Sequence, residues 1–179
     1  MSLAEHHRRR SRTLHIQRFS WFTFMLGGLL VVQFLAGIQT VSAREVLAYA
    51  TNINRTDLHS LHNQERARAG LSSLNLNSQL NSAAQAKAEH MIANNYWSHI
   101  APDGTTPWFF FDQAGYDYTN AGENLAYGFT TSSGTVTGWM NSAGHKANIL
   151  GSYVDVGFGI ADGANYQGGE NTVVVAMFG

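Results

Sequence analysis

Three titratable residues stand in settings where side chains commonly carry out chemistry. His99 lies in the segment NYWSHIAPDGTTPW, Glu123 in the small and apolar stretch AGENLAYG, and His145 in WMNSAGHKANIL. Two imidazole nitrogens and a carboxylate oxygen suit Zn²⁺ and would leave a fourth position open for water. The intervals between positions 99, 123 and 145 carry no information by themselves. The zinc hypothesis therefore depends on whether the fold brings the three side chains together.

Each of these residues also has a plain structural interpretation. A single loop histidine such as His99 is often a turn or surface residue, and His145 could form a hydrogen bond near a helix terminus. Glu123 could lie on an edge strand and face water. Alternatively it is paired with a histidine or a metal in a cleft, because burying an unpaired carboxylate is costly.

Several familiar catalytic patterns are missing from the sequence. The chain has no cysteine, which excludes thiol catalysis, zinc–thiolate sites and disulfides. It contains neither the H-E-x-x-H pattern of zinc proteases nor the G-x-S-x-G elbow of serine hydrolases. Ser142 near His145 does not amount to a triad, since neighbours in sequence rarely have triad geometry.

His62 is interpreted as a polar bridge between its helix and a loop.

The elements that must position these residues are predicted as helices first and strands last. Helices are expected to begin at Thr56 or Asp57, at Asn77, at Thr106–Pro107 and at Thr131–Ser133, with Gly70 ending the first and Gly115 the third. Residues 154–160 alternate as a half-buried strand does, 172–178 form a strand covered on both sides, and AGENLAYG is an additional strand. Residues 161–171 are expected to form a hairpin loop. This order predicts an α+β domain with helices packed over an antiparallel sheet.

The amino-terminal region predicts export. Residues 1–18 are basic and are expected to be cytoplasmic, and residues 19–43 carry no charge, so they are either a transmembrane anchor or a cleaved signal peptide. Residues 44–56 would be a linker and 57–179 an extracellular domain. From Arg44 onward, 6 Lys and Arg stand against 11 Asp and Glu, a charge of −5 without a basic stripe, which argues against a nucleic-acid partner. A membrane partner is expected only through residues 19–43.

Six motifs occur in an order that resembles the CAP superfamily, which includes cysteine-rich secretory proteins, antigen 5 and pathogenesis-related class 1 proteins. They are LHNQERARAGLSSLNLNSQL, NYWSHIAPDGTTPW, AGENLAYG, WMNSAGHKANIL, VGFGIA and VAMFG. The resemblance runs from about Leu58 to Gly179. The absence of cysteine is similar to the bacterial branch of SCP-like extracellular proteins.

This resemblance implies a three-layer α-β-α sandwich with a large central cleft. In some members of the family the two cleft histidines bind zinc, and these histidines match His99 and His145. The acid of the family's GEN motif matches Glu123. A second acid usually lies three residues after the helix tryptophan, but here that position is Ser142. This departure weakens the case for acid-assisted hydrolysis.

The resemblance also implies a structural role for two residues of the first helix. Asn63 and Arg66 match the family's first-helix signature, where they are expected to tie the helix to the core.

Three functions remain open at this point. The first is an exported binding module whose cleft accepts a lipid, glycan or peptide and holds a divalent metal, and this one is favoured. The second is a structural or adhesive protein of the cell envelope. The third is a metal-dependent hydrolase in which Glu123 acts as general base and His99 and His145 as zinc ligands.

Overall fold

The computed structural model describes residues 51–179. The predicted segments 1–18 and 19–43 and most of the predicted linker 44–56 lie outside the described residues. Among the helices of residues 51–179, none has the length and apolar character needed to cross a bilayer.

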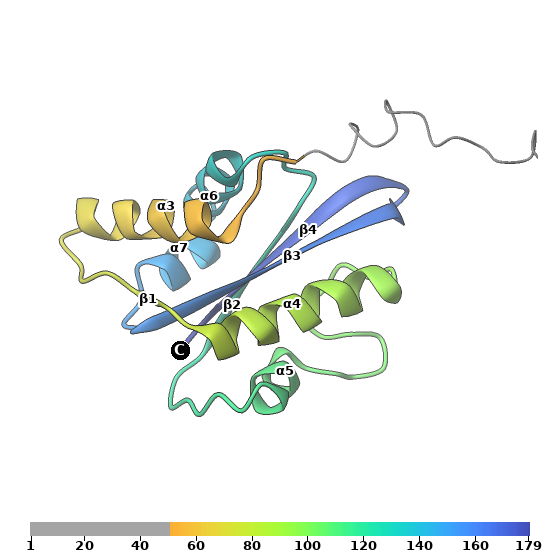
Figure 1. Ribbon diagram of the computed structural model, residues 1–179, viewed down its shortest axis with the longest axis horizontal. Coiled ribbons are helices and arrows are strands. Elements are labelled where there is room, and N and C mark those ends of the chain that lie inside the picture. The colour runs from red at the N-terminus through yellow and green to blue at the C-terminus, as the bar shows by residue number, and fades with distance from the viewer. Residues whose placement is uncertain (1–50) are drawn as a thin grey trace, which may run out of the picture. The chain divides into compact units, whose positions relative to one another are not determined.

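A four-stranded sheet is enclosed between two layers of helices (Figure 1). The strand order is β1-β3-β4-β2; β2 and β3 each pair with β4 in antiparallel fashion, and the short β1 pairs with β3 in parallel fashion. The strands are β1 (Asn75–Leu76), β2 (Gly122–Tyr127), β3 (Asp155–Tyr166) and β4 (Gly169–Phe178). One face carries α3 (Arg55–Arg68), α6 (Ser132–Met140) and α7 (Ala143–Ile149), and the other carries α4 (Ser78–Ala93) and α5 (Pro107–Gln113). The predicted α-β-α sandwich is confirmed.

Most helix starts agree with the sequence, and one does not. Asn77 caps α4 and Thr131 caps α6 through their side-chain oxygens, as predicted. The first helix instead begins earlier than predicted, with Asn54 as its cap and Asp57 already in the first turn. The Asn54 Oδ1 accepts a hydrogen bond of 2.9 Å from the Asp57 backbone N–H, so an equally good capping residue precedes Thr56.

The β3–β4 hairpin is longer than predicted. Most of residues 161–171 belong to the two strands, and the register closes at the Tyr166–Gly169 pair. Only Gln167 and Gly168 form the turn, both with positive φ, 50° and 84°. A two-residue turn with positive φ at both positions matches the twist of an antiparallel pair, so a loop-like composition is compatible with strand here.

β3 is covered on both faces, whereas the sequence suggested a half-buried strand. Val156 and Phe158 belong to the core under α3, α6 and α7. Gly157 and Gly159 face α4, where an added Cβ would lie 2.1 Å from the backbone of Leu80 or Ala84. The glycines therefore do not mark a solvent face. They let the backbone of α4 approach the sheet closely.

His62 lies in the core rather than at a loop, so its interpretation as a polar bridge is wrong. Its ring is fully buried and meets Trp139 and Phe158 edge-on, with centroids 5.5 and 4.9 Å away. Nδ1 lies 2.7 Å from the Leu58 carbonyl oxygen, and Nε2 is buried without a hydrogen-bond partner. Burial lowers the pKa of His62 to about 4, so the ring is neutral at neutral pH.

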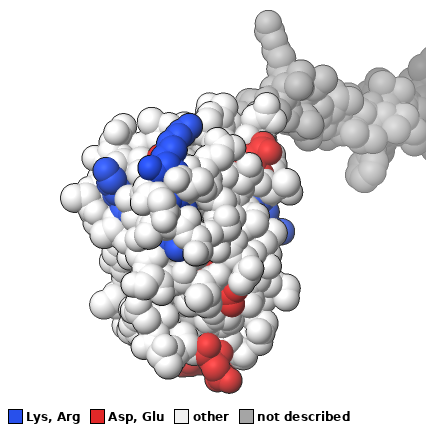
Figure 2. All heavy atoms as spheres, turned by 90° about the vertical axis from the view of Figure 1, so that its left-hand side faces the viewer, with Lys and Arg blue, Asp and Glu red and all other residues white. Residues whose placement is uncertain are grey.

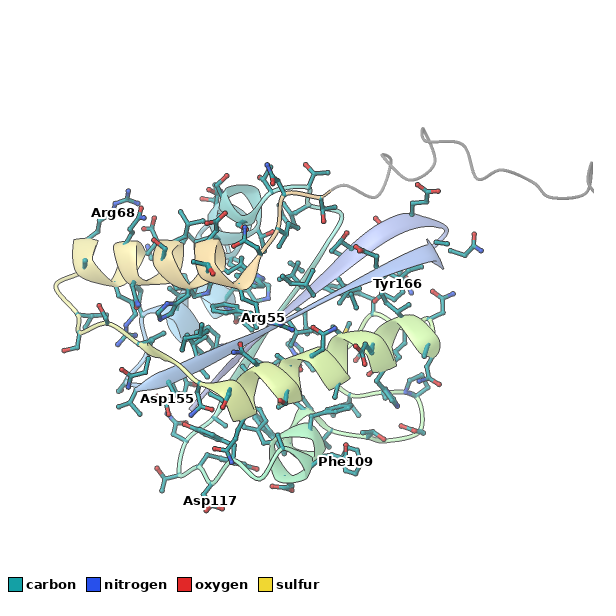
Figure 3. All side chains as sticks on the ribbon, in the orientation of Figure 1. Arg55, Arg68, Phe109, Asp117, Asp155 and Tyr166 are labelled. Carbon is teal, nitrogen blue, oxygen red and sulfur yellow. The ribbon has the colours of Figure 1, made fainter. Side chains whose placement is uncertain are left out.

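Charged side chains are sparse on the face drawn in Figure 2. Lys and Arg lie in its upper half, Asp and Glu are scattered from its upper edge to its lower end, and most of the surface is uncharged. Figure 3 places Arg68 of α3 towards the upper end and Asp117, in the loop after α5, towards the lower end. A nucleic-acid site would need a continuous basic stripe, which this face lacks.

Candidate functional site

The site is built on β2, whose side chains alternate between the two layers of the sandwich. Leu125 packs in the core under α4 and α5, and Ala126 packs in the core on the opposite face. Glu123 shares the face of Leu125, since residues two apart on a strand point the same way. The Glu123 side chain is only 2% exposed.

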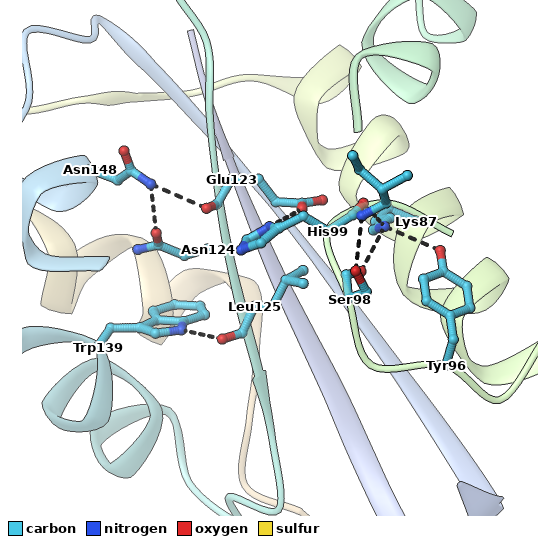
Figure 4. A network of polar contacts seen from close by, with 10 residues as sticks. Lys87, Tyr96, Ser98, His99, Glu123, Asn124, Leu125, Trp139 and Asn148 are labelled. Atoms are coloured by element: carbon cyan, nitrogen blue, oxygen red, sulfur yellow. Dashed lines mark hydrogen bonds and ion pairs between the residues drawn. The ribbon is translucent and has the colours of Figure 1, made fainter. Parts of the chain in front are cut away.

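His99 meets this carboxylate from the loop that follows α4. Its Nδ1 lies 2.6 Å from the Glu123 Oε1, as Figure 4 shows. Because a carboxylate accepts hydrogen bonds, this contact places a proton on Nδ1 and directs the lone pair of a neutral ring to Nε2. The His99 side chain is 56% exposed. A buried acid therefore orients an accessible imidazole.

Lys87 of α4 supports this pair, and sequence reasoning did not single it out. It is fully buried, and its Nζ donates to the Tyr96 hydroxyl at 3.1 Å and to the carbonyl oxygens of Ser98 and His99 at 3.3 and 2.6 Å. The lysine thus holds the main chain of the residue that carries the imidazole (Figure 4). A signal was present, because Lys87 lies on the helix stripe that otherwise carries Ala84, Ala88 and Met91.

The electrostatics of the site balance one buried cation against one buried anion. Burial lowers the pKa of Lys87, and the charge of Glu123 opposes part of that shift. Burial raises the pKa of Tyr96 to about 12, and the negative charge of Glu123 adds to the effect. The Glu123 Oε2 is buried without a hydrogen-bond partner. In Figure 4 the Glu123 carboxylate lies between His99 and Lys87.

His145 reaches the same region from α7. Two amide side chains join α7 to β2: Asn124 Nδ2 donates to the His145 carbonyl oxygen at 3.0 Å, and Asn148 Nδ2 donates to the Glu123 carbonyl oxygen at 3.1 Å. Partial burial lowers the pKa of His145, and the charge of the nearby His99 lowers it further. Asn124 and Asn148 were missed by sequence reasoning, although Asn124 is part of the quoted GEN motif.

Ser142, Asn63 and Arg66 lie outside the His99–Glu123 pair. Ser142 is the N-cap residue of α7 and makes no side-chain capping bond. Arg66 donates to the carbonyl oxygens of Ile149 and Gly151 at 2.9 and 2.7 Å. Both carbonyl oxygens lie at or just after the end of α7, so Arg66 ties α3 to α7. Asn63 accepts from the backbone N–H of Leu74 at 2.8 Å and donates to its carbonyl at 3.1 Å, and such contacts hold backbone rather than ligand.

An open hollow of about 370 Å³ surrounds the pair. Its lining consists of His99, Ile100, Thr106, Pro107, Trp108, Ala121, Gly122, Glu123 and Asn148. Within residues 51–179, no three His, Cys, Asp or Glu side chains are grouped so that they could hold a metal ion. The donors present are two imidazoles, because Glu123 is bound to His99. They fall short of the three protein ligands of a catalytic zinc site.

Comparison with known proteins identifies the family of this chain. Residues 59–178 match the family described as "CAP: Cysteine-rich secretory protein family". The protein YkwD of Bacillus subtilis is 37% identical over 103 residues, which cover 57% of this chain and 40% of that protein. The membrane protein YlbC of the same organism is 31% identical over 124 residues, covering 69% and 32%. The chain thus spans about a third to two fifths of the length of these relatives.

Solved structures show the same fold. An extracellular SCP-domain protein of Bacillus anthracis is 26% identical with a TM-score of 0.62, covering 69% of this chain and 39% of that one. An outer surface protein of Borrelia burgdorferi is 22% identical with a TM-score of 0.61, covering 69% and 90%. The family match covers more than half of this sequence and includes every residue of the site described above. The chain belongs to the CAP family of cysteine-rich secretory proteins and carries an SCP-type domain of the kind found in extracellular proteins.

Proposed function

We propose that this chain is an exported binding module whose ligand site is the hollow around His99 and Glu123. Export is supported by the uncharged segment 19–43 after a basic segment and by the extracellular SCP-domain protein that this chain resembles. Residues 19–43 would act as a signal peptide or as a membrane anchor.

The observation that carries the proposal is the 2.6 Å contact between the buried Glu123 carboxylate and the exposed His99 ring. A carboxylate that binds Nδ1 fixes the tautomer and the orientation of the ring. The ring then presents Nε2 to the hollow, ready to bind a metal ion or to accept a hydrogen bond from a ligand. Such an arrangement gives a preorganised polar group in a lining that also holds the Trp108 ring and the polar side chains of Thr106 and Asn148.

The divalent ion in this proposal would be held by His99 and His145, with water completing its shell. Two imidazole ligands favour a weakly held ion over a resident structural zinc, and Glu123 supports His99 from behind rather than binding the metal. Bound there, the ion would supply Lewis acidity to a ligand oxygen. No reaction step is assigned to it.

Zinc titration of the full chain by calorimetry tests this part of the proposal. We expect His99→Ala and His145→Ala each to abolish binding, and Glu123→Gln to weaken it by about 10- to 100-fold. His59→Gln on α3 is the matched histidine control and should leave binding unchanged. If zinc binds equally well to both alanine variants, this site is wrong. If zinc does not bind and His145→Ala only lowers the melting temperature, the histidines are structural.

A hydrolase is the second candidate, because a buried carboxylate behind an exposed imidazole is also the arrangement of a general base. In that case His99 Nε2 would take the proton, since Glu123 is too buried to reach a substrate. A screen of ester and peptide substrates decides: turnover lost in His99→Ala and strongly reduced in Glu123→Gln supports an enzyme. Tight ligand binding without turnover on any substrate supports the binding module.

A further inference from the structure

Exposed aromatic side chains follow the free edge of β2 beyond the His99–Glu123 pair. Trp97 and Tyr127 lie at its far end, where their ring centroids are 4.6 Å apart, and both remain partly exposed. Trp108 and Ile100 line the hollow at the near end and are also exposed. Four large apolar groups in one region of a small domain are unusual unless they meet a ligand.

Two contacts show that these groups form a row rather than a scattered set. Trp97 meets Tyr127 and His99 meets Glu123, so residues 97–99 run alongside β2 in the opposite direction. Tyr127 and Glu123 share one face of the strand, four residues or about 13 Å apart. The row therefore passes from Trp97 and Tyr127, over His99, to the hollow with Trp108. From Tyr127 to Glu123 alone the row is about 13 Å long.

A peptide added as an extra strand does not fit this edge. The Glu123 carbonyl oxygen accepts a hydrogen bond from Asn148, and the Leu125 carbonyl oxygen accepts one of 2.9 Å from Trp139 Nε1. Strand addition needs exposed backbone groups in a row, and two carbonyl groups of this edge are already occupied. α6 and α7 supply the side chains that block it.

The charge and polarity of the hollow indicate the chemistry of the ligand. Among its lining residues, all of them in the described part of the chain, the ionisable ones are Glu123 and His99, which are bound to each other. Within residues 51–179, no Lys or Arg lines the hollow to receive a phosphate or sulfate. Thr106 and Asn148 add a hydroxyl and an amide beside the aromatic rings. Exposed flat rings next to neutral hydrogen-bonding groups match a polymer that has apolar C–H faces and many hydroxyl groups.

We propose that this row binds a neutral polysaccharide, with sugar rings stacked on Trp97 and Trp108 and hydroxyl groups bonded to His99, Thr106 and Asn148. The inference rests on the proposed binding function and names its ligand class. It requires no metal ion, because the rings and the neutral polar groups supply the contacts. Glycan binding and zinc binding can therefore fail independently.

Adsorption of the full chain, in mild detergent and with EDTA present, to chitin, cellulose and mannan tests the proposal. We expect saturable retention on at least one of them, with an affinity about tenfold lower for Trp97→Ala and for Trp108→Ala. Phe109→Ala is the matched control: Phe109 is 46% exposed beside Trp108 at 40%, but it does not line the hollow. It should bind as the parent does.

Three results would overturn the proposal. One is no retention on any of the three polysaccharides. Another is retention that both tryptophan variants preserve. The third is capture by phosphatidylglycerol vesicles that depends on Trp97 and Trp108, which would make the ligand a lipid. Capture that does not depend on these two residues would be due to residues 19–43, and the proposal would then be judged by retention on the polysaccharides. Glycan retention without zinc binding would refute the metal site alone, and zinc binding without retention would refute this inference alone.

Discussion

His62 makes the stability of this domain depend on pH over a defined range. Its ring is fully buried between Trp139 and Phe158, and burial lowers the pKa from 6.5 to about 4. In the unfolded chain the ring titrates near 6.5. Between these two pH values the unfolded chain binds a proton at His62 and the folded chain does not. The contribution of the neutral His62 ring to the stability of the fold is therefore complete above pH 6.5 and is lost as the pH falls towards 4.

The magnitude follows from the two pKa values. A difference between 6.5 and about 4 corresponds to about 3 kcal/mol of unfolding free energy lost at acid pH. The structure explains the cost: Nδ1 faces the Leu58 carbonyl oxygen, and Nε2 lies buried without a partner. Protonation would leave a charged N–H group there with no acceptor.

Urea unfolding at a series of pH values between 8 and 4 measures this loss. His62→Phe keeps a ring among the same aromatic neighbours but cannot titrate, so its curve should fall less steeply than that of the parent chain. The two curves should diverge by about 3 kcal/mol between pH 7.5 and pH 4. Whatever packing change the phenylalanine introduces shifts its curve at all pH values alike. Parallel curves would refute the assignment of the acid sensitivity to His62.

Three further perturbations test the packing and the site. Gly159→Ala places a Cβ 2.1 Å from the Ala84 carbonyl oxygen, so we expect a loss of about 3 kcal/mol or more, measured by thermal or urea unfolding. Lys87→Met removes three hydrogen bonds to the loop after α4, and hydrogen exchange of that loop should accelerate at least tenfold while the strands stay protected. Ser142→Glu adds a carboxylate one helical turn before His145, so zinc affinity should rise in calorimetry.

Each of these perturbations has its control on α7. An added Cβ at Gly144 has no neighbour within 4 Å, so Gly144→Ala should leave stability unchanged or slightly higher. Lys146 is exposed, and Lys146→Met should not alter exchange in the loop after α4. Ser142→Gln adds a side chain of similar size without charge and should leave zinc affinity as it was. Equal effects of variant and control would contradict the reasoning in each case.

The parts of the fold that the sequence predicted are those set by local chemistry. Capping residues located α4 and α6, apolar alternation located β3, and a continuous apolar run located β4, because these signals act within a few residues. The glycines of β3 were misinterpreted, since a glycine that faces water and a glycine that admits a helix backbone look identical in sequence. Only the packing of α4 on Gly157 and Gly159 distinguishes them.

Sequence reasoning predicted less of the site than of the fold, because the site depends on contacts between distant residues. His99, Glu123 and His145 were singled out from their sequence settings, but only the family resemblance predicted that they converge, since their spacing along the chain does not encode their distance in space. Lys87 was missed because its role comes from a contact with the main chain of His99, which no side-chain pattern records. His62 was misplaced because a polar residue on a helix is ordinarily assigned to the surface.

The partners of Glu123 explain what a single acid can do in this site. A carboxylate as buried as Glu123 needs polar partners, and the His99 ring and the nearby side chain of Lys87 supply them. Ser142 stands where relatives usually carry a second acid, so this position adds no further carboxylate to the site. Glu123 is bound to the His99 ring, so it is not free to act as a base itself. The chemistry left to the hollow is that of the oriented His99 imidazole, as a group that binds a ligand or, in the hydrolase alternative, as the general base.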